Sequence, residues 1–261
     1  MAGHSLSSLA FTLLVLLAFS VKAPAATVIV SASADTSIVS NNPDSNLGGT
    51  TLVAGTNQQY SVGRALFSFN LSAIPVGATI TSVQVDLTVT RQPDPDQHGG
   101  PVGSNFSLYQ MLVGWGQGTG SGTTGSPAMT GDATWNQNHY GVSSWAAPGG
   151  LAGTDFAADP SATTSISGLG SYQWGSTSGL VADVQSWLAD PSSNFGFMLT
   201  SDAENTPGSA RRFASIEQPG GGIPAPQLIV TYTLAVPEPS LPGLLMLGTG
   251  ALAMTRRRRR V

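Results

Sequence analysis

The sequence predicts an all-β fold, an antiparallel β-sandwich with one short helix. The first observation is the stretch 64–90, where apolar and polar residues alternate in two runs, as in strands with one buried face. The second is composition, because the 261 residues include 32 Gly and 17 Pro but only 9% charged residues, which is typical of one β-rich domain with many turns. Such strands need a second sheet over their apolar face, and we expect the rest of the chain to supply it. The residues predicted on the buried faces are Ala65, Phe67, Phe69, Leu71, Val83, Val85, Leu87 and Val89.

Residues 1–25 are predicted to be a signal peptide. The run 9–21 is apolar, and residues 23–25 read Ala-Pro-Ala, which places small residues at the positions that a signal peptidase reads. Cleavage after Ala25 is therefore expected, and the alternative is an uncleaved amphipathic anchor. The chain has no cysteine, so the exported domain of residues 26–233 must be stabilised by core burial without disulfides.

Short apolar runs between turn residues predict the elements of this domain. Strands are expected at 27–30, 37–39, 64–71, 82–90, 106–113, 195–200, 211–216 and 227–232. One helix is expected over 179–191, because Leu180, Val184, Trp187 and Leu188 recur at helical spacing and Asp190-Pro191 ends the run.

Two motifs with catalytic or nucleotide-binding associations are discounted. Gly120, Gly122 and Gly125 form a G-x-G-x-x-G match, but no helix follows them to bind a phosphate. The segment 175–179 has the glycines of a nucleophile elbow, but its centre is Thr177 rather than serine.

The acidic and amide residues near the first strands are candidates for a structural calcium site. Asp35, Asp44 and Asn46 supply the oxygen ligands that calcium takes from irregular loops. The alternative is that these residues cap turns through side-chain hydrogen bonds. No other cofactor is expected.

The tryptophans suggest a glycan-binding surface. All five, Trp115, Trp135, Trp145, Trp174 and Trp187, lie in loop-forming sequence, and exposed indoles stack on the apolar face of sugar rings. Trp135 and Trp145 are the preferred platforms, with Asn136 and Tyr140 as polar neighbours. The alternative is that buried tryptophans anchor the loops, and we expect at least three of the five to be structural.

Charge excludes nucleic acid as a partner of the domain. Outside the two ends, thirteen acidic residues face only four arginines, which gives a net charge of −9. The four are Arg64, Arg91, Arg211 and Arg212. A second mode of glycan binding would use Arg64, Arg211 and Arg212 to hold a polyuronate, since guanidinium groups pair with carboxylates.

A glycan-cleaving enzyme, hydrolase or lyase, is the alternative to a noncatalytic binding protein. Glycoside hydrolysis needs two carboxyl groups on facing sides of a cleft. The candidates are Asp35, Asp132, Asp183, Glu204 and Glu217. No spacing pairs them and no Ser-His-Asp arrangement is legible, so no catalytic residue is assigned and the protein is not expected to be an enzyme.

The order of motifs in the domain resembles a known family. The segments are ADTSIVSNNPDSNLGG, GRALFSFNLSAIPVGATITSVQVDLTV, ATWN, SSWAAPGG, LVADVQSWL, NFGFMLTSD, RRFASIE and PQLIVTY. From about Ala34 to Tyr232 this succession resembles a DNRLRE-type domain, the group related to carbohydrate-binding module family 96. The resemblance implies a jelly-roll β-sandwich that acts as a binding or adhesive module in exported, envelope-associated proteins, some of which hold alginate-like polysaccharides. The family usually has arginine in its F-x-S-R-E motif, and here Ile216 stands at that position.

Residues 234–261 resemble a PEP-CTERM sorting tail. Val236, Pro237, Glu238 and Pro239 are followed by a short apolar segment, 241–255, and then by Arg256, Arg257, Arg258, Arg259 and Arg260. The apolar segment is short for a bilayer, but arginines on one side orient and hold it with the C-terminus in the cytoplasm. The resemblance implies an exosortase as partner, together with signal peptidase during export. It also implies a transient inner-membrane intermediate and then the cell surface or matrix of a Gram-negative bacterium that makes exopolysaccharide, with that exopolysaccharide or a cell-surface glycan as ligand.

Overall fold

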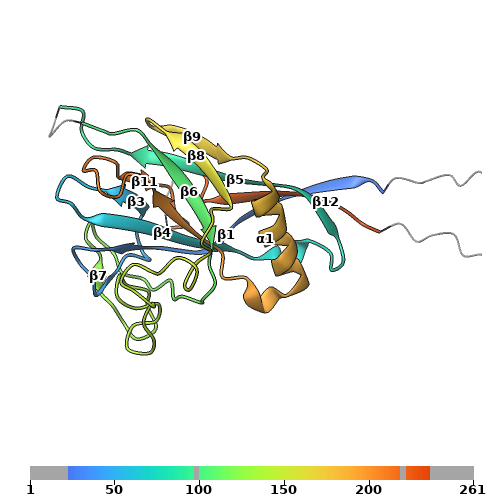
Figure 1. The fold of residues 1–261 in the computed structure, drawn as a ribbon, viewed down its shortest axis with the longest axis horizontal. Coiled ribbons are helices and arrows are strands. Elements are labelled where there is room, and N and C mark those ends of the chain that lie inside the picture. The colour runs from blue at the N-terminus through green and yellow to red at the C-terminus, as the bar shows by residue number, and fades with distance from the viewer. Residues whose placement is uncertain (1–22, 97–99, 218–221, 236–261) are drawn as a thin grey trace, which may run out of the picture. The chain divides into compact units, whose positions relative to one another are not determined.

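The computed structural model describes residues 23–96, 100–217 and 222–235. It confirms the predicted all-β sandwich with one α-helix (Figure 1). The strands are β1 (Ala25–Val39), β2 (Ser45–Asn46), β3 (Leu52–Thr56), β4 (Val62–Phe69), β5 (Thr79–Arg91), β6 (Ser104–Gln110), β7 (Ser126–Pro127), β8 (Ala162–Ile166), β9 (Gly170–Trp174), β10 (Phe197–Ser201), β11 (Arg211–Phe213) and β12 (Gln227–Thr233). The helices are η1 (Leu71–Ala73), α1 (Ser178–Ala189) and η2 (Pro191–Ser193).

Two antiparallel sheets share strands at their edges. One contains β5 with β12 and β9 beside it and connects through β11 to β3, and the other has the order β4, β10, β6, β8. Strand β1 belongs to both, because its first half pairs with β12 and its second half with β4. The register shift between Ala32 and Ala34 marks the change of sheet, as expected where a strand bends at the corner of a sandwich.

The central stretch has the predicted faces. Val83, Val85, Leu87 and Val89 of β5 are buried, as are Phe67 and Phe69 of β4. These side chains belong to one apolar cluster between the sheets. The ring centroids of Phe67 and Phe69 lie 5.8 Å apart at nearly right angles, an arrangement that aromatic pairs favour.

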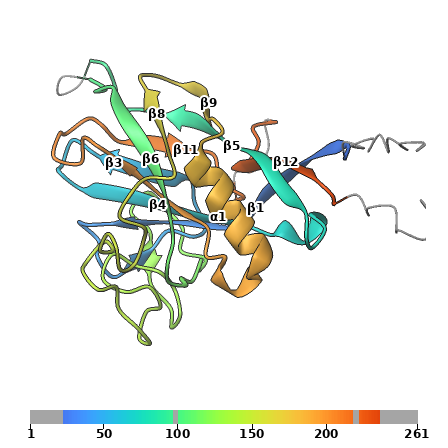
Figure 2. The ribbon, with the colours of Figure 1, turned by 45° about the vertical axis from the view of Figure 1, so that its right-hand side comes forward.

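Helix α1 covers one end of this core (Figure 2). Its buried residues are Leu180, Val184, Trp187 and Leu188, as the spacing predicts. The side chain of Thr177 accepts a hydrogen bond from the Leu180 N–H and so caps the helix start. The helix ends at Ala189, before Pro191, whose ring cannot continue it.

A second apolar cluster lies on the other face of β4, beneath the long segment 111–161. Ile38, Leu66 and Met198 come from β1, β4 and β10, and Trp145 and Phe156 come from the segment itself. Strand β4 is therefore buried on both faces. This explains why so long a stretch without regular structure is ordered: its apolar side chains cover a sheet face that would otherwise meet water.

The structure corrects several predicted boundaries. Strand β1 is continuous where two strands, 27–30 and 37–39, were expected, because the residues between them are small and polar and give no apolar alternation. Strands β3, β8 and β9 were not predicted. Strand β6 ends at Gln110 and β11 at Phe213, each three residues earlier than expected.

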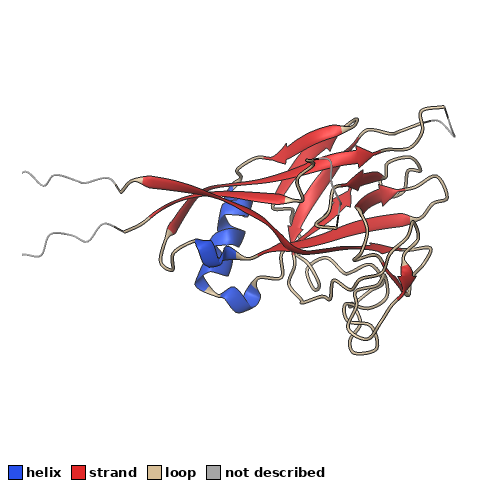
Figure 3. Cartoon of the chain, turned by 180° about the vertical axis from the view of Figure 1, so that it is seen from behind, coloured by secondary structure: helices blue, strands red, loops and turns tan. Residues whose placement is uncertain are grey.

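The first and last described strands, β1 and β12, run side by side away from the core (Figure 3). The predicted signal peptide before residue 23, the sorting motif from Val236 to Pro239 and the arginines from Arg256 to Arg260 lie outside the described residues. Among the residues that are described, no helix is long and apolar enough to cross a membrane.

Candidate functional site

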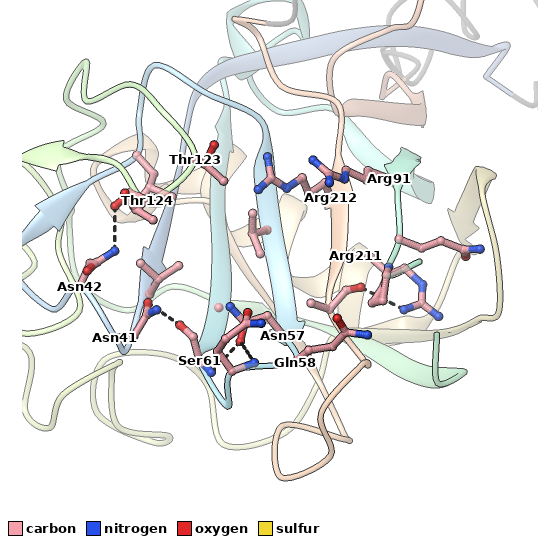
Figure 4. Close-up of a pocket in the computed structure, with 18 of the residues that line it drawn as sticks. Asn41, Asn42, Asn57, Gln58, Ser61, Arg91, Thr123, Thr124, Arg211 and Arg212 are labelled. Carbon is pink, nitrogen blue, oxygen red and sulfur yellow. Dashed lines mark hydrogen bonds between the residues drawn. The ribbon is translucent and has the colours of Figure 1, made fainter. Parts of the chain in front are cut away.

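A polar groove lies where five segments meet (Figure 4). The segments are the chain after β1, the β3–β4 turn, the chain after β5, the start of β11 and the tip of the glycine-rich loop, residues 114–131. The groove has a volume of about 410 Å³. Its polar lining consists of amides, hydroxyls, two accessible arginines and a carboxylate: Asn41, Asn42, Asn57, Gln58, Gln59, Ser61, Thr123, Thr124, Arg91, Arg212 and Asp94.

The β3–β4 turn forms one wall and is built around Asn57. The Asn57 Oδ1 accepts hydrogen bonds from the N–H groups of Gln59 at 2.8 Å and Ser61 at 2.9 Å. Tyr60 takes a φ of 61°, the left-handed region that few side chains other than Asn and Asp enter. Its side chain is 73% exposed. The turn therefore presents an aromatic ring to solvent beside the amides of the groove.

A neighbouring wall is fixed by hydrogen bonds between loops. The Ser61 hydroxyl donates to Asn41 Oδ1 at 2.6 Å, and Asn42 Nδ2 donates to the Thr124 carbonyl at 3.2 Å. These contacts join the chain after β1 to the β3–β4 turn and to the glycine-rich loop. The groove is thus held by polar contacts between its own walls.

The side chain of Asn46 holds the backbone of the glycine-rich loop in place. Its Oδ1 accepts from the N–H groups of Gly48 at 3.0 Å and Gly120 at 2.8 Å, and its Nδ2 donates to the carbonyls of Gln117 and Ala133. A Cβ on Gly120 would lie 2.1 Å from the Asn46 carbonyl oxygen. The G-x-G-x-x-G match therefore reflects close packing around one asparagine, and Gly120 cannot be replaced without moving the loop.

Arg91 and Arg212 are cross-strand partners on β5 and β11, and both line the groove. Arg91 is exposed and Arg212 is half-buried. Burial lowers the pKa of Arg212, and the charge of Arg91 lowers it further. Two like charges placed opposite each other destabilise a sheet. An anionic group or a strong hydrogen-bond acceptor bound in the groove would offset this repulsion.

Arg211, a predicted glycan contact, is instead a structural residue. It is 1% exposed, and its guanidinium donates to the carbonyls of Gly208, Ser209, Ala210 and Val102. Burial lowers its pKa. Of the two predicted arginines 211 and 212, only Arg212 remains accessible to a ligand.

Trp145, a predicted stacking platform, has no exposed face. It is 4% exposed and belongs to the second apolar cluster, and its Nε1 donates to the Thr134 carbonyl at 2.8 Å. Trp174 and Trp187 are buried in the main core. Three of the five tryptophans are therefore structural, as expected.

Trp135 is half-buried and its ring is covered by protein groups. The Arg64 guanidinium carbon lies 5.5 Å from the ring centroid, and a Cβ on Gly149 would lie 2.7 Å from the ring. Arg64 is also occupied, because its Nε and Nη2 donate to Glu204 at 2.8 and 2.7 Å. Asn136 donates to Asp44 at 3.0 Å, and Tyr140 is half-buried in the same loop segment. None of these residues lines the groove.

The three predicted calcium ligands have different surroundings. Asp44 accepts from Asn136 at the surface, and both polar ends of the Asn46 amide are engaged as described above. Asp35 is fully buried and is close to Glu217 instead.

The five candidate catalytic carboxylates do not share a cleft. Glu204 pairs with Arg64, Asp132 accepts from the Met129 N–H, and Asp183 lies on α1, where burial raises its pKa. Asp35 and Glu217 approach each other, but Asp35 has no exposed surface with which to meet a substrate.

Sequence reasoning missed the groove because it missed β3. Once Leu52–Thr56 is a strand, the segment Asn57-Gln58-Gln59-Tyr60 becomes the tip of a hairpin. An aromatic residue among amides at such a tip is a recognisable sign of an exposed binding surface.

Comparison with models of known protein families finds none that matches this chain, and comparison with curated proteins finds no matching sequence.

Proposed function

We propose that the protein is an exported, noncatalytic cell-surface or matrix protein that binds polysaccharide in the groove beside Tyr60. The observation that carries this proposal is the lining of the groove, which combines amides, hydroxyls and two neighbouring arginines. The exposed Tyr60 is not itself a lining residue, but it lies in the chain between the lining residues Gln59 and Ser61. Sugar hydroxyls pair with amides, and aromatic rings cover the apolar face of a sugar.

The charges favour a polysaccharide with few carboxylates. Arg91 and Arg212 provide a local site for an anionic group, whereas the net charge of −9 on the domain repels a dense polyanion. We therefore infer a mostly neutral exopolysaccharide or cell-surface glycan with occasional acidic residues.

The terminal segments support export and a cell-surface or matrix location. The predicted signal peptide ending at Ala25 and the tail with Val236, Pro237, Glu238 and Pro239 lead us to propose export, processing by signal peptidase and an exosortase, and a transient inner-membrane stage. Intact-mass analysis of the exported protein should find both ends removed. Recovery of exported protein that still carries Arg256 to Arg260 would contradict processing of the tail.

The test of binding uses the full chain and a panel of neutral and uronate-containing polysaccharides. Affinity electrophoresis should show retardation by at least one of them, and a reducing-end assay on the same panel should show no cleavage. Release of reducing ends would favour the alternative, a glycan-cleaving enzyme. Free migration with every polysaccharide would overturn the proposed function.

A further inference from the structure

Asp35 and Glu217 bring two carboxyl groups together in the interior. Asp35 has no exposed surface, and its Oδ2 accepts a hydrogen bond from the Ile216 N–H at 2.8 Å. Glu217 Oε1 accepts from Gln117 Nε2 at 2.5 Å. The two carboxyl groups are close enough to interact electrostatically. The other oxygen of each, Asp35 Oδ1 and Glu217 Oε2, is buried without a hydrogen-bond donor.

Two buried hydroxyls without partners belong to the same region. Ser215 is 2% exposed, and neither its Oγ nor the Oγ1 of Thr51 has a hydrogen-bond partner. Thr51 directly precedes β3, whose first residue Leu52 pairs with Phe213, so Thr51 lies beside the segment that carries Ser215 and Glu217.

The strand register places Asp35 at the level of Thr51. Strands β1 and β3 both run antiparallel to β4 and are therefore parallel to each other. The Ser37 Oγ accepts from the Val53 N–H at 2.7 Å. Asp35 and Thr51 each lie two residues before these partners, so the two residues lie near the same level of the sandwich.

Four buried oxygen atoms on neighbouring segments, from two carboxylates and two hydroxyls, thus have no hydrogen-bond partner. A buried polar atom without a partner costs free energy, and a buried carboxylate costs more. A cation at this place would satisfy the unpartnered oxygens of Asp35 and Glu217.

We propose that Asp35, Thr51, Ser215 and Glu217 bind a calcium ion. Calcium takes six to eight oxygen ligands in flexible geometry, and two carboxylates balance its charge. A recess of about 360 Å³ is lined by two of the four residues, Thr51 and Glu217, and would give an ion and its waters access from solvent. Among the described residues no three His, Cys, Asp or Glu side chains group together, so hydroxyl, backbone and water oxygens would have to complete the coordination.

The site differs from the one predicted from the sequence, because Asp35 keeps its role while Glu217, Ser215 and Thr51 replace Asp44 and Asn46. Arg212 lines the same recess, so its charge opposes the cation and limits the affinity. The proposal does not depend on glycan binding.

The test is calcium titration of the full chain after treatment with a chelator, followed by calorimetry and thermal melting. Calcium up to about 10 mM, above the dissociation constants of extracellular calcium modules, should give saturable binding and raise the Tm by a few degrees. Magnesium at the same concentration should give a much smaller shift.

Three variants locate the ion. Asp35→Asn and Glu217→Gln should each weaken calcium binding by about tenfold or more, the loss expected when a carboxylate ligand is removed. Asp159→Asn removes an exposed carboxylate elsewhere and should bind calcium as the wild type does. An unchanged Tm and no heat of binding with calcium would overturn the proposal, and would assign a shared proton to the pair. An equal loss of calcium affinity in Asp159→Asn would likewise overturn the proposal. Wild-type calcium affinity in Glu217→Gln would overturn it too.

Discussion

Arg64 of β4 forms a two-bond ion pair with Glu204 in the turn after β10 and also binds the long segment 111–161. Arg64 Nε and Nη2 donate to the two Glu204 oxygens at 2.8 and 2.7 Å, and Nη1 donates to the Gly149 carbonyl at 2.9 Å. The guanidinium also lies over the ring of Trp135. One strand residue thus fixes two surface segments, and Arg64 is occupied by protein groups while it covers one side of the Trp135 ring.

Glu204→Gln should therefore destabilise the fold. The Arg64 and Glu204 side chains are only 18% and 23% exposed, so the variant leaves a mostly buried guanidinium without its counter-charge, at a cost of about 1–2 kcal/mol. Urea unfolding of the full chain measures this cost. Asp159→Asn, which removes an exposed carboxylate, should change stability by less than about 0.5 kcal/mol. Equal urea midpoints for Glu204→Gln and the wild type would show that the ion pair contributes nothing to the stability of the fold.

Trp145→Ala should be far more damaging than Trp135→Ala. Trp145 is buried in the second apolar cluster and donates to Thr134, and its truncation should cost about 3–5 kcal/mol. Trp135 is only partly buried, so its loss should cost less. Thermal melting compares the two, and any variant that folds should keep glycan binding. A Trp145→Ala protein that melts like the wild type but no longer binds would return the stacking site to that residue.

The buried faces of the core could be predicted because they follow from patterns among residues that are close in sequence. Alternation in 64–90 identified the buried faces of β4 and β5, and the spacing of Leu180, Val184 and Trp187 identified α1. Strand β9 gave no such signal, since a sequence such as GSYQW becomes a strand only through pairing with β5. This is the usual way in which tertiary context overrides weak β-propensity.

The site was harder to predict because burial decides which polar residues are accessible. Arg211 and Arg212 are neighbours in sequence and both border the groove, yet alternation along β11 buries the first and leaves the second partly exposed. Tyr60 can be recognised as an exposed residue at a turn only once the β3–β4 hairpin is known. Asp35 and Glu217 interact although they are 182 positions apart in sequence, and no spacing rule joins residues that far apart.

Asp183→Asn should stabilise the protein near neutral pH. Burial raises the pKa of Asp183 above its ordinary value of 3.8, and its Oδ2 is buried without a partner. Protonation therefore favours the folded state, so this contribution to stability is complete below 3.8 and is lost as pH rises through the raised pKa. The Tm of the variant should exceed that of the wild type at about pH 7 and match it at about pH 4. A lower Tm at neutral pH would mean that the charged carboxylate is stabilised.

Glycan binding by groove variants of the full chain is the most direct test of the proposed site. Tyr60→Ala should weaken binding about fivefold at an unchanged Tm, because stacking contributes about 1 kcal/mol and the side chain is 73% exposed. Arg91→Gln should weaken binding of acid-containing polysaccharides and reduce its dependence on salt. Val142→Ala, which truncates a side chain 70% exposed outside the groove, should bind as the wild type does. If Tyr60→Ala and Arg91→Gln both bind every polysaccharide with wild-type affinity at low and physiological salt, the groove is not the binding site.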